Sequence, residues 1–352
     1  MPAFDFVILG CGGGPSENNL SSYLLKAAES SWNEGIIAVE AGSGIGALTN
    51  IMENQPDLFG RPTDNSDEKP YSAADVLSWI RCYLITHAHM DHINGLVLCT
   101  GSLAGAARRI YAAHQTLKDI ERVFSDRLWP NLASWNDDEK AMLIYSQLHP
   151  DGKYTRLSDT FSVRSLPLSH GHTQQGECYE STAFFIKHDT SAQELLFFGD
   201  VEPDGVSANP RNREVWRTAA SKIPQTLSTI FVECSYPTGR PDDQLYGHMS
   251  PEHLARELTV LAEEVLELRR ARQGNGQPVR KRRRTNTDTA PKERRNVLSG
   301  LVVYIIHCKD DLQRKWDKPI HQVIAGQVRA LTEAEELGVE IRAAEQGMLI
   351  CE

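Results

Sequence analysis

Short apolar runs separated by turn-forming residues dominate the first part of the chain, a pattern typical of strands joined by short connections. The first run, residues 4–9, leads into a glycine-rich loop at 10–14. Further runs at 21–25, 36–40 and 81–86 complete the predicted strands of a first sheet. Downstream apolar runs predict a second set of strands at 161–168, 182–187, 194–198, 228–233 and 301–307.

Helical periodicity is clearest after Ser250, a typical N-cap residue that is followed by Pro251 at the first helical position. Apolar residues then recur at helical spacing, and a second helix of this kind is predicted over 320–337. Further helices are expected at 115–125 and 139–148. Because strands and helices come in two successive sets, the pattern favours an α/β sandwich of two sheets with helices outside.

These elements predict a single domain over residues 1–352 that carries two insertions. The first, about 101–160, is expected to be largely helical. The second, about 273–296, passes from Gly and Asn into Arg, Lys and Thr and is expected to be disordered, because it has too few apolar residues to join a core. Residues 280–284 are all basic, which fits either a solvated insertion or a nuclear-import signal.

The charge distribution argues against a long nucleic acid as the partner. The chain has a formal net charge of −10, and residues 280–295 carry eight Lys or Arg against two acids, which leaves −16 for the remainder. A strongly acidic body repels a polyanion. A small phosphate ligand stays compatible with this charge, because divalent cations would dominate the field at a local site.

Seven scattered cysteines without a CxxC pair indicate reduced thiols rather than a disulfide framework. The N-terminal residues lack the basic and apolar regions of a signal peptide, and no apolar run is long enough to cross a bilayer. We therefore expect a cytoplasmic protein without a membrane partner, with a nuclear location as the alternative. The pattern leaves the oligomeric state open.

Residues 86–92 read Thr-His-Ala-His-Met-Asp-His and carry the strongest chemical signal of the chain. Three imidazoles and one carboxylate within six positions form a ligand set that suits zinc. The segment lies between a predicted strand and the predicted start of a helix. On such a loop His87 and His89 can face one side while Asp91 and His92 face another, so one segment can serve two metal ions.

The HxHxDH spacing resembles the signature of the metallo-β-lactamase superfamily. Its longer form at 87–96, His-Ala-His-Met-Asp-His-Ile-Asn-Gly-Leu, is similar to that of the class II cyclic-nucleotide phosphodiesterases. The resemblance implies a metallo-β-lactamase-like αββα sandwich of two mixed sheets with outer helices and a two-metal site at one edge. It also implies hydrolysis of a small-molecule 3′,5′-cyclic nucleotide, cyclic AMP or cyclic GMP, to the 5′-monophosphate.

The resemblance also assigns ligands to two divalent metal ions, for which Zn²⁺ is the expected identity. His170 ends a predicted strand and corresponds to a ligand of the first ion, with His172 as its rival. Asp200 follows an apolar strand and corresponds to a bridging carboxylate, with Asp204 as the weaker candidate. The implied set is His87, His89 and His170 for one ion, Asp91, His92 and His307 for the other, and Asp200 between them.

A glutamate at a strand end and a later Gly-His-Met-Ser segment resemble the pair found in tRNA 3′-processing endonucleases of the superfamily. By this analogy Glu233 orients His248, which gives a proton to the departing 3′-oxygen as general acid. A helix-capping histidine is the alternative. The analogy makes a metal-bridging hydroxide the nucleophile and places Asp91 among the catalytic groups. The glycine-rich opening resembles the class II enzymes as well, which makes Glu17 and Asn19 candidate substrate contacts.

Three other functions are compatible with this ligand set. A tRNA 3′-processing endonuclease would share the site, and the basic insertion could mimic its tRNA-holding arm, but the acidic body counts against it. A thioester or lactone hydrolase would not need the Glu233–His248 pair. A non-catalytic scaffold would be expected to lose ligands, and none is missing. The sequence does not separate cyclic AMP from cyclic GMP, or zinc from manganese or iron.

Overall fold

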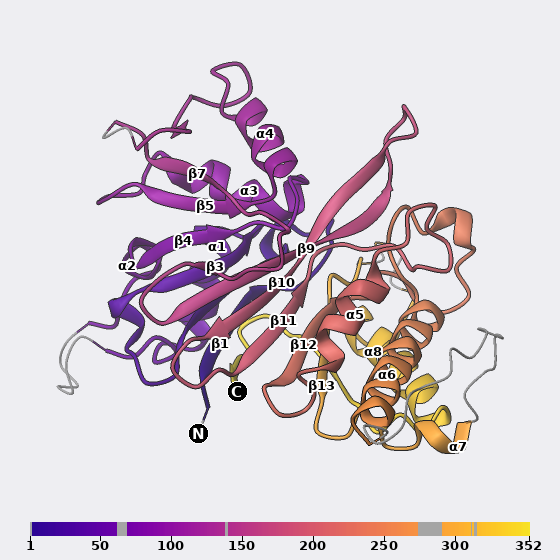
Figure 1. The fold of residues 1–352 in the computed structure, drawn as a ribbon. Coiled ribbons are helices and arrows are strands. Elements are labelled where there is room, and N and C mark those ends of the chain that lie inside the picture. The colour runs from indigo at the N-terminus through magenta and orange to yellow at the C-terminus, as the bar shows by residue number, and fades with distance from the viewer. Residues whose placement is uncertain (1, 62–68, 138–139, 274–290, 311, 313–314) are drawn as a thin grey trace.

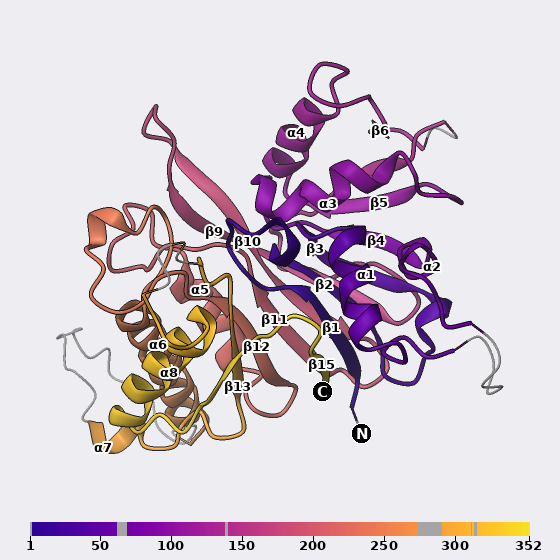
Figure 2. The ribbon, with the colours of Figure 1, turned by 180° about the vertical axis from the view of Figure 1, so that it is seen from behind.

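Two β-sheets lie face to face in the protein, and helices cover the outer face of each sheet (Figure 1 and, from behind, Figure 2). The computed structural model describes residues 2–61, 69–137, 140–273, 291–310, 312 and 315–352. Antiparallel and parallel pairs occur in both sheets. The predicted αββα sandwich of two mixed sheets with outer helices is therefore confirmed.

The first sheet has eight strands in the order β15-β1-β2-β3-β4-β5-β7-β6. Its members from β15 to β3 pair antiparallel, and those from β3 to β6 pair in parallel. The strands are β1 (Phe4–Gly10), β2 (Ser22–Ala27), β3 (Ile36–Ala41), β4 (Ile80–Leu84), β5 (Arg108–Ala112), β6 (Ala133–Ser134), β7 (Leu143–Gln147) and β15 (Leu349–Cys351).

The second sheet has seven strands in the order β14-β13-β12-β11-β10-β9-β8. Strands β8 to β11 pair antiparallel, whereas β11 to β14 pair in parallel, so β9, β11, β12 and β13 all run in one direction. The strands are β8 (Thr155–Arg156), β9 (Phe161–His172), β10 (Cys178–His188), β11 (Glu194–Phe198), β12 (Leu227–Glu233), β13 (Val302–Ile306) and β14 (Glu340–Ala343).

Aromatic side chains fill the space between the two sheets. The ring of Phe6 lies 4.5 Å from that of Phe231, and the ring of Tyr23 lies 5.0 Å from that of Phe197. Neighbours of these residues along the strands point the other way, toward the helices, so both faces of the central strands are buried. This burial on both faces explains why the strands appear in the sequence as nearly continuous apolar runs.

The helices divide between the two outer faces. Those near the first sheet are α1 (Ile45–Asn54), α2 (Ala73–Ser78), α3 (Met90–Thr100) and α4 (His114–Val123). Those on the side of the second sheet are α5 (Asn212–Ala220), α6 (Pro251–Gln273), α7 (Pro291–Arg294) and α8 (Ile320–Ala334). Single 3₁₀ turns occur at η1 (Glu17–Asn19), η2 (Trp32–Glu34) and η3 (Asp242–Gln244). Within the described part of the chain, none of the helices combines the length and apolar character needed to cross a membrane.

The predicted helical insertion over 101–160 is wrong. Of the described residues in this range, only α4 forms a helix, and β5, β6 and β7 extend the first sheet. The predicted helix over 139–148 is instead mainly strand β7, which pairs in parallel with β5. Residues 143–145 are consecutive buried apolar positions, and a run this short is compatible with a strand buried on both faces.

The second predicted insertion, 273–296, lies mostly outside the described residues. Its end is ordered, however, because Pro291–Arg294 form α7 and the amide of Asn296 donates to the carbonyl of Glu336. The expectation of disorder is therefore wrong for the last residues of this range. Arg294 explains part of the order, since its guanidinium lies 3.5 Å from carboxylate oxygens of both Glu263 and Glu335.

Candidate active site

The predicted ligands lie together at one edge of the sandwich, where strands of both sheets end. The loop between β4 and α3 carries the HxHxDH segment from the first sheet. On the second sheet, strands β9, β11, β12 and β13 run in the same direction, so their carboxyl ends meet at one edge. His170 lies near the end of β9, while Asp200 and His307 follow β11 and β13. Residues far apart in the sequence are thereby brought into contact.

The structure groups the ligand atoms into two clusters that share one carboxylate. The atoms of each cluster lie within 4.8 Å of one another, and Asp200 belongs to both. The first cluster consists of His87, His89, His170 and Asp200; the second consists of Asp91, His92, Asp200 and His307. A third group of the same kind, His170, Asp200, Glu233 and His248, overlaps them. The grouping brings together the residues that the family resemblance assigned to each ion, and metal binding by them stays a prediction.

The histidine nitrogens face one another at distances that suit a cation between them. His87 Nε2 lies 3.1 Å from His89 Nδ1, and His92 Nε2 lies 3.2 Å from His307 Nε2. His170 Nδ1 donates to the carbonyl of Gly247 at 2.7 Å, so its Nε2 presents a lone pair toward the cluster. Lone pairs that converge in this way repel each other unless a cation lies between them. The donor set therefore fits metal binding.

Burial keeps several of these imidazoles neutral. It lowers the pKa of His87 and of His170 well below the usual value. For Asp200 burial acts in the opposite direction, but His307 and His92 outweigh it and hold the carboxyl pKa well below its ordinary value. Neutral imidazoles beside an ionised carboxylate are the protonation states in which these groups bind a metal.

The surroundings of His92 favour a positive charge on its ring. Burial alone would lower its pKa, yet the carboxylates of Asp200 and Glu40 raise it well above the ordinary value. Its Nδ1 lies 3.0 Å from Glu40 and its Nε2 lies 3.4 Å from Asp200. A buried position between two carboxylates is stabilised by a positive charge, and a divalent cation at the Nε2 side would supply it.

Next to the two clusters lies a histidine–glutamate pair. The carboxylate of Glu233 is fully buried and accepts hydrogen bonds from His248 Nδ1 at 2.9 Å and from the Val201 amide at 2.8 Å. The ring of His248 lies 4.8 Å from that of His170, and its Nδ1 lies 3.7 Å from Asp200. The predicted pair is thus formed beside the clusters, with Nδ1 engaged by Glu233.

The glycine-rich loop packs directly against a predicted ligand. A side chain at Gly13 would place its Cβ 2.6 Å from the His307 ring, so only glycine fits there. The amide of His307 donates to the Cys11 carbonyl at 2.6 Å, and His307 itself has a φ of 58°. A histidine in this left-handed conformation is uncommon and marks a constrained position. The loop therefore helps to hold His307 in place.

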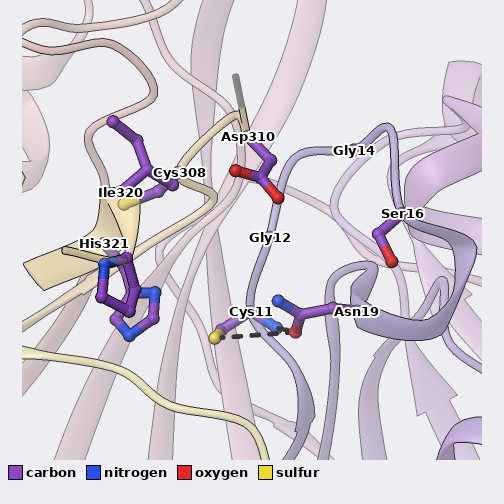
Figure 3. Close-up of a pocket in the computed structure, with 10 residues that line it drawn as sticks. Cys11, Gly12, Gly14, Ser16, Asn19, Cys308, Asp310, Ile320 and His321 are labelled. Carbon is purple, nitrogen blue, oxygen red and sulfur yellow. Dashed lines mark hydrogen bonds between the residues drawn. The ribbon is translucent and has the colours of Figure 1, made fainter. Parts of the chain in front are cut away.

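The two predicted substrate contacts lie at this loop, and neither belongs to the ligand clusters. Asn19 uses its side-chain oxygen to accept from the Cys11 amide at 2.9 Å, which shapes the loop. Glu17 is exposed on the turn η1. A cavity of about 200 Å³ lies beside the loop. Asn19 is one of the residues that line it (Figure 3). Its lining also includes Cys11, Gly12, Gly14, Ser16, Cys308, Asp310 and His321.

The two alternative ligand candidates, His172 and Asp204, lie outside the two clusters of predicted metal ligands. His172 sits at the last position of β9, opposite Cys178, and does not belong to any of the metal-type clusters found among the described residues. Asp204 accepts from the amides of Asn212 and Arg213 at 2.9 and 3.0 Å, so its carboxylate caps the start of α5. Geometry therefore favours His170 over His172 and Asp200 over Asp204.

Glu40 is the site residue that sequence reasoning missed. Its fully buried carboxylate accepts from the Thr86 amide at 2.9 Å and binds His92, and its φ is 58°. Thus one side chain orients both the start of the HxHxDH segment and one of its histidines. A glutamate inside the apolar run Ile-Ile-Ala-Val-Glu-Ala could have served as the signal, because a buried carboxylate requires partners.

Comparison with known proteins agrees with this geometry. The chain is 35% identical to a 3′,5′-cyclic-nucleotide phosphodiesterase of Schizosaccharomyces pombe over 74% of this chain and 75% of the relative. It is 28% identical to a probable enzyme of the same name from Yersinia pestis, over 98% of this chain and 88% of that one. Unliganded yeast PDE1 superimposes over 100% of both chains with a TM-score of 0.80 and 25% identity.

A more distant structure indicates the fold. The protein YhfI of Bacillus subtilis, described as a metallo-β-lactamase fold protein, superimposes with a TM-score of 0.56 at 13% identity over 99% of both chains. The model of the class-II cAMP phosphodiesterases matches residues 64–347, a range that includes the HxHxDH segment and all the remaining predicted metal ligands. This chain therefore belongs to the class-II cAMP phosphodiesterase family and has the metallo-β-lactamase fold.

Proposed function

We propose that this enzyme hydrolyses 3′,5′-cyclic nucleotides, cyclic AMP, cyclic GMP or both, to the 5′-monophosphate. The observation that carries the proposal is the side-by-side arrangement of two ligand clusters sharing Asp200 and the Glu233–His248 pair. The names of the relatives point to the same substrate class. A phosphodiester is a substrate that needs both features, namely cations near its oxygens and a proton for its leaving group.

The proposed metal ligands are the residues of the two clusters, and Zn²⁺ is the ion we assign to both. Imidazole nitrogens and carboxylate oxygens are ligands that zinc accepts readily. When bound, two divalent ions would stabilise charge on the phosphate oxygens and lower the pKa of a water molecule between them. Thr86, Glu40 and Gly247 hold the outward-facing Nδ1 atoms of His87, His92 and His170, so the ligands are oriented before any ion binds.

His248 is the proposed proton donor. As water adds to phosphorus, the bond between phosphorus and O3′ breaks and the departing oxygen takes a proton from His248 Nε2. Glu233 supports this transfer, because its carboxylate fixes Nδ1 and stabilises the protonated ring before the proton is lost. Ser235 donates to the second oxygen of Glu233 at 2.7 Å, which holds the carboxylate in that orientation. The product keeps its phosphate on O5′.

The cysteines support a cytoplasmic location for the enzyme. All seven are free thiols in the structure, and several are buried. Free thiols of this kind are typical of proteins in a reducing compartment.

The direct test incubates purified, zinc-loaded protein with cyclic AMP, cyclic GMP and a tRNA precursor. We expect the 5′-monophosphate as product from at least one cyclic nucleotide, and about two metal ions per chain by elemental analysis. Chromatography separates 5′- from 3′-monophosphates, so it reports which P–O bond breaks. Cleavage of the tRNA precursor without hydrolysis of either cyclic nucleotide would refute the proposal.

A further inference from the structure

Three planar side chains extend outward from His248 toward solvent, and we call them the Tyr–Arg–Tyr stack. The ring of Tyr236 meets the His248 ring edge-on at 5.9 Å. The guanidinium carbon of Arg240 lies 3.7 Å from the centre of the Tyr236 ring, and 5.7 Å from the centre of the Tyr246 ring. Tyr246 forms the outer end, where its side chain is 70% exposed.

The backbone that follows Tyr246 is fixed by the candidate active site. The φ of Tyr246 is 52°, a conformation that a bulky residue seldom adopts. The next residue, Gly247, accepts from His170 Nδ1, and a Cβ there would lie 2.8 Å from the His170 backbone. His248 follows and is bound to Glu233. A disfavoured conformation held in this way beside a reaction centre points to a functional position for the exposed ring.

Arg240 holds its place in the stack without an acidic partner. Its Nε donates to the carbonyl of Gln244 at 2.6 Å. Across the described part of the chain, no carboxylate comes within ion-pair distance of its guanidinium, although the protein carries a net charge of −10. The position is instead set by the faces of the two tyrosines, which attract a cation. Arg240 therefore lies near the Tyr246 ring, while most of Tyr246 remains open to solvent.

We propose that the exposed face of Tyr246 is the stacking surface for the purine base of the substrate, with Arg240 as the residue that positions the ring. This inference rests on the proposed function and extends it to the base. A nucleotide whose phosphate lies at the clusters and whose O3′ faces His248 extends its base beyond His248, where the stack ends. Aromatic rings bind bases of any sequence through their faces, so this surface accepts adenine and guanine alike.

Base stacking adds binding energy that is the same in the ground state and in the transition state, so its loss should raise KM and leave kcat nearly unchanged. Tyr246→Ala should raise KM for cyclic AMP and cyclic GMP by about 5- to 100-fold. Tyr246→Phe should restore the wild-type value, because the ring face is kept. Arg240→Ala should give a smaller rise, and the double variant should be no worse than Tyr246→Ala, since Arg240 acts through the ring.

A base-free substrate separates base recognition from a general disturbance of the site. Methyl riboside 3′,5′-cyclic phosphate has the sugar and the cyclic phosphate but a methoxy group in place of the base. Its KM should be the same for the wild type and for Tyr246→Ala. Arg156→Ala is a matched control, because Arg156 is an exposed arginine on β8, which pairs with β9 far from His170. It should behave as wild type on every substrate.

The outcomes distinguish this inference from the proposed function. An unchanged KM of Tyr246→Ala on both cyclic nucleotides would overturn the stacking role, and the cavity beside Cys308 (Figure 3) would become the site to test for the base. An equal loss on the base-free substrate would also overturn it, because the ring would then act on the phosphate site. If the wild-type enzyme hydrolyses neither cyclic nucleotide, the proposed function itself fails and this inference fails with it.

Discussion

Replacing His248 separates proton donation from every other role of the candidate active site. His248→Ala should retain both metal ions, because His248 Nδ1 is engaged by Glu233 and His248 is absent from the two clusters that hold the predicted metal ligands. Loss of a general acid typically slows a reaction about 10²- to 10⁴-fold. Cyclic AMP leaves through an alkoxide and should suffer this full loss. Bis(p-nitrophenyl) phosphate releases a stabilised phenoxide, so it should lose about tenfold or less.

The contacts of Glu233 set the size of the secondary effects. His248→Ala removes one hydrogen bond to a carboxylate that is completely buried, which should lower the free energy of unfolding by about 1–3 kcal/mol. His248→Asn keeps a donor to Glu233 and should lose less stability while remaining equally slow. Glu233→Gln turns a charge-assisted hydrogen bond into a neutral one, a difference of about 1 kcal/mol, or roughly fivefold in rate.

The assay compares kcat for the two substrates and measures metal content and urea unfolding of each variant. The expected signature is a large loss on cyclic AMP, a small loss on the activated diester and unchanged metal content. Equal losses on both substrates with both metals present would show that His248 binds phosphate or shapes the pocket. The proton would then come from another group, and the assignment of the Glu233–His248 pair would be wrong.

Four further variants test the ligand assignments and the role of Glu40. Asp200→Asn should reduce activity by several orders of magnitude and release the ion of the His92–His307 cluster first. The Asp200 oxygen lies 3.4 and 3.2 Å from the nitrogens of those two histidines, but 3.7 Å from those of His87 and His170. Elemental analysis showing two ions per chain, together with normal turnover, would contradict this. His170→Ala should deplete metal and activity far more than His172→Ala, and the reverse ranking would exchange their roles. Glu40→Gln should weaken metal affinity about 10- to 100-fold in a chelator competition, whereas unchanged affinity would make Glu40 purely structural.

Much of the candidate active site could be predicted because its residues come at the ends of recognisable strands. His87, His89, Asp91 and His92 lie in one short segment, so their spacing alone indicates a metal site. Asp200 and His307 each follow an apolar run, and the parallel direction of those strands brings them to one edge. The family resemblance supplied the assignment of the later ligands, and the common direction of their strands explains why they meet.

Other features depend on contacts that a single sequence does not reveal. The short apolar run of β7 was mistaken for a helix because a strand and a helix buried on both sides look alike over five residues. Glu40 was missed because its role depends on Thr86 and His92, which lie over forty residues away. Asn19 has a structural role that its sequence context did not indicate, because its side-chain oxygen binds the backbone of its own loop; its contact with substrate stays a prediction.

The ligands of each cluster come from both sheets, and this has a consequence for folding. His307 and Asp91 lie 216 residues apart in the chain, yet their side chains are 3.1 Å apart across the edge of the sandwich. An ion bound there links the two halves of the fold, so metal affinity and folding stability become parts of one equilibrium. Free metal at about a thousand times its dissociation constant would stabilise the folded state by about 4 kcal/mol. Thermal denaturation at graded metal concentrations would thus measure metal affinity without any substrate. The same measurement would work in variants that no longer hydrolyse the substrate.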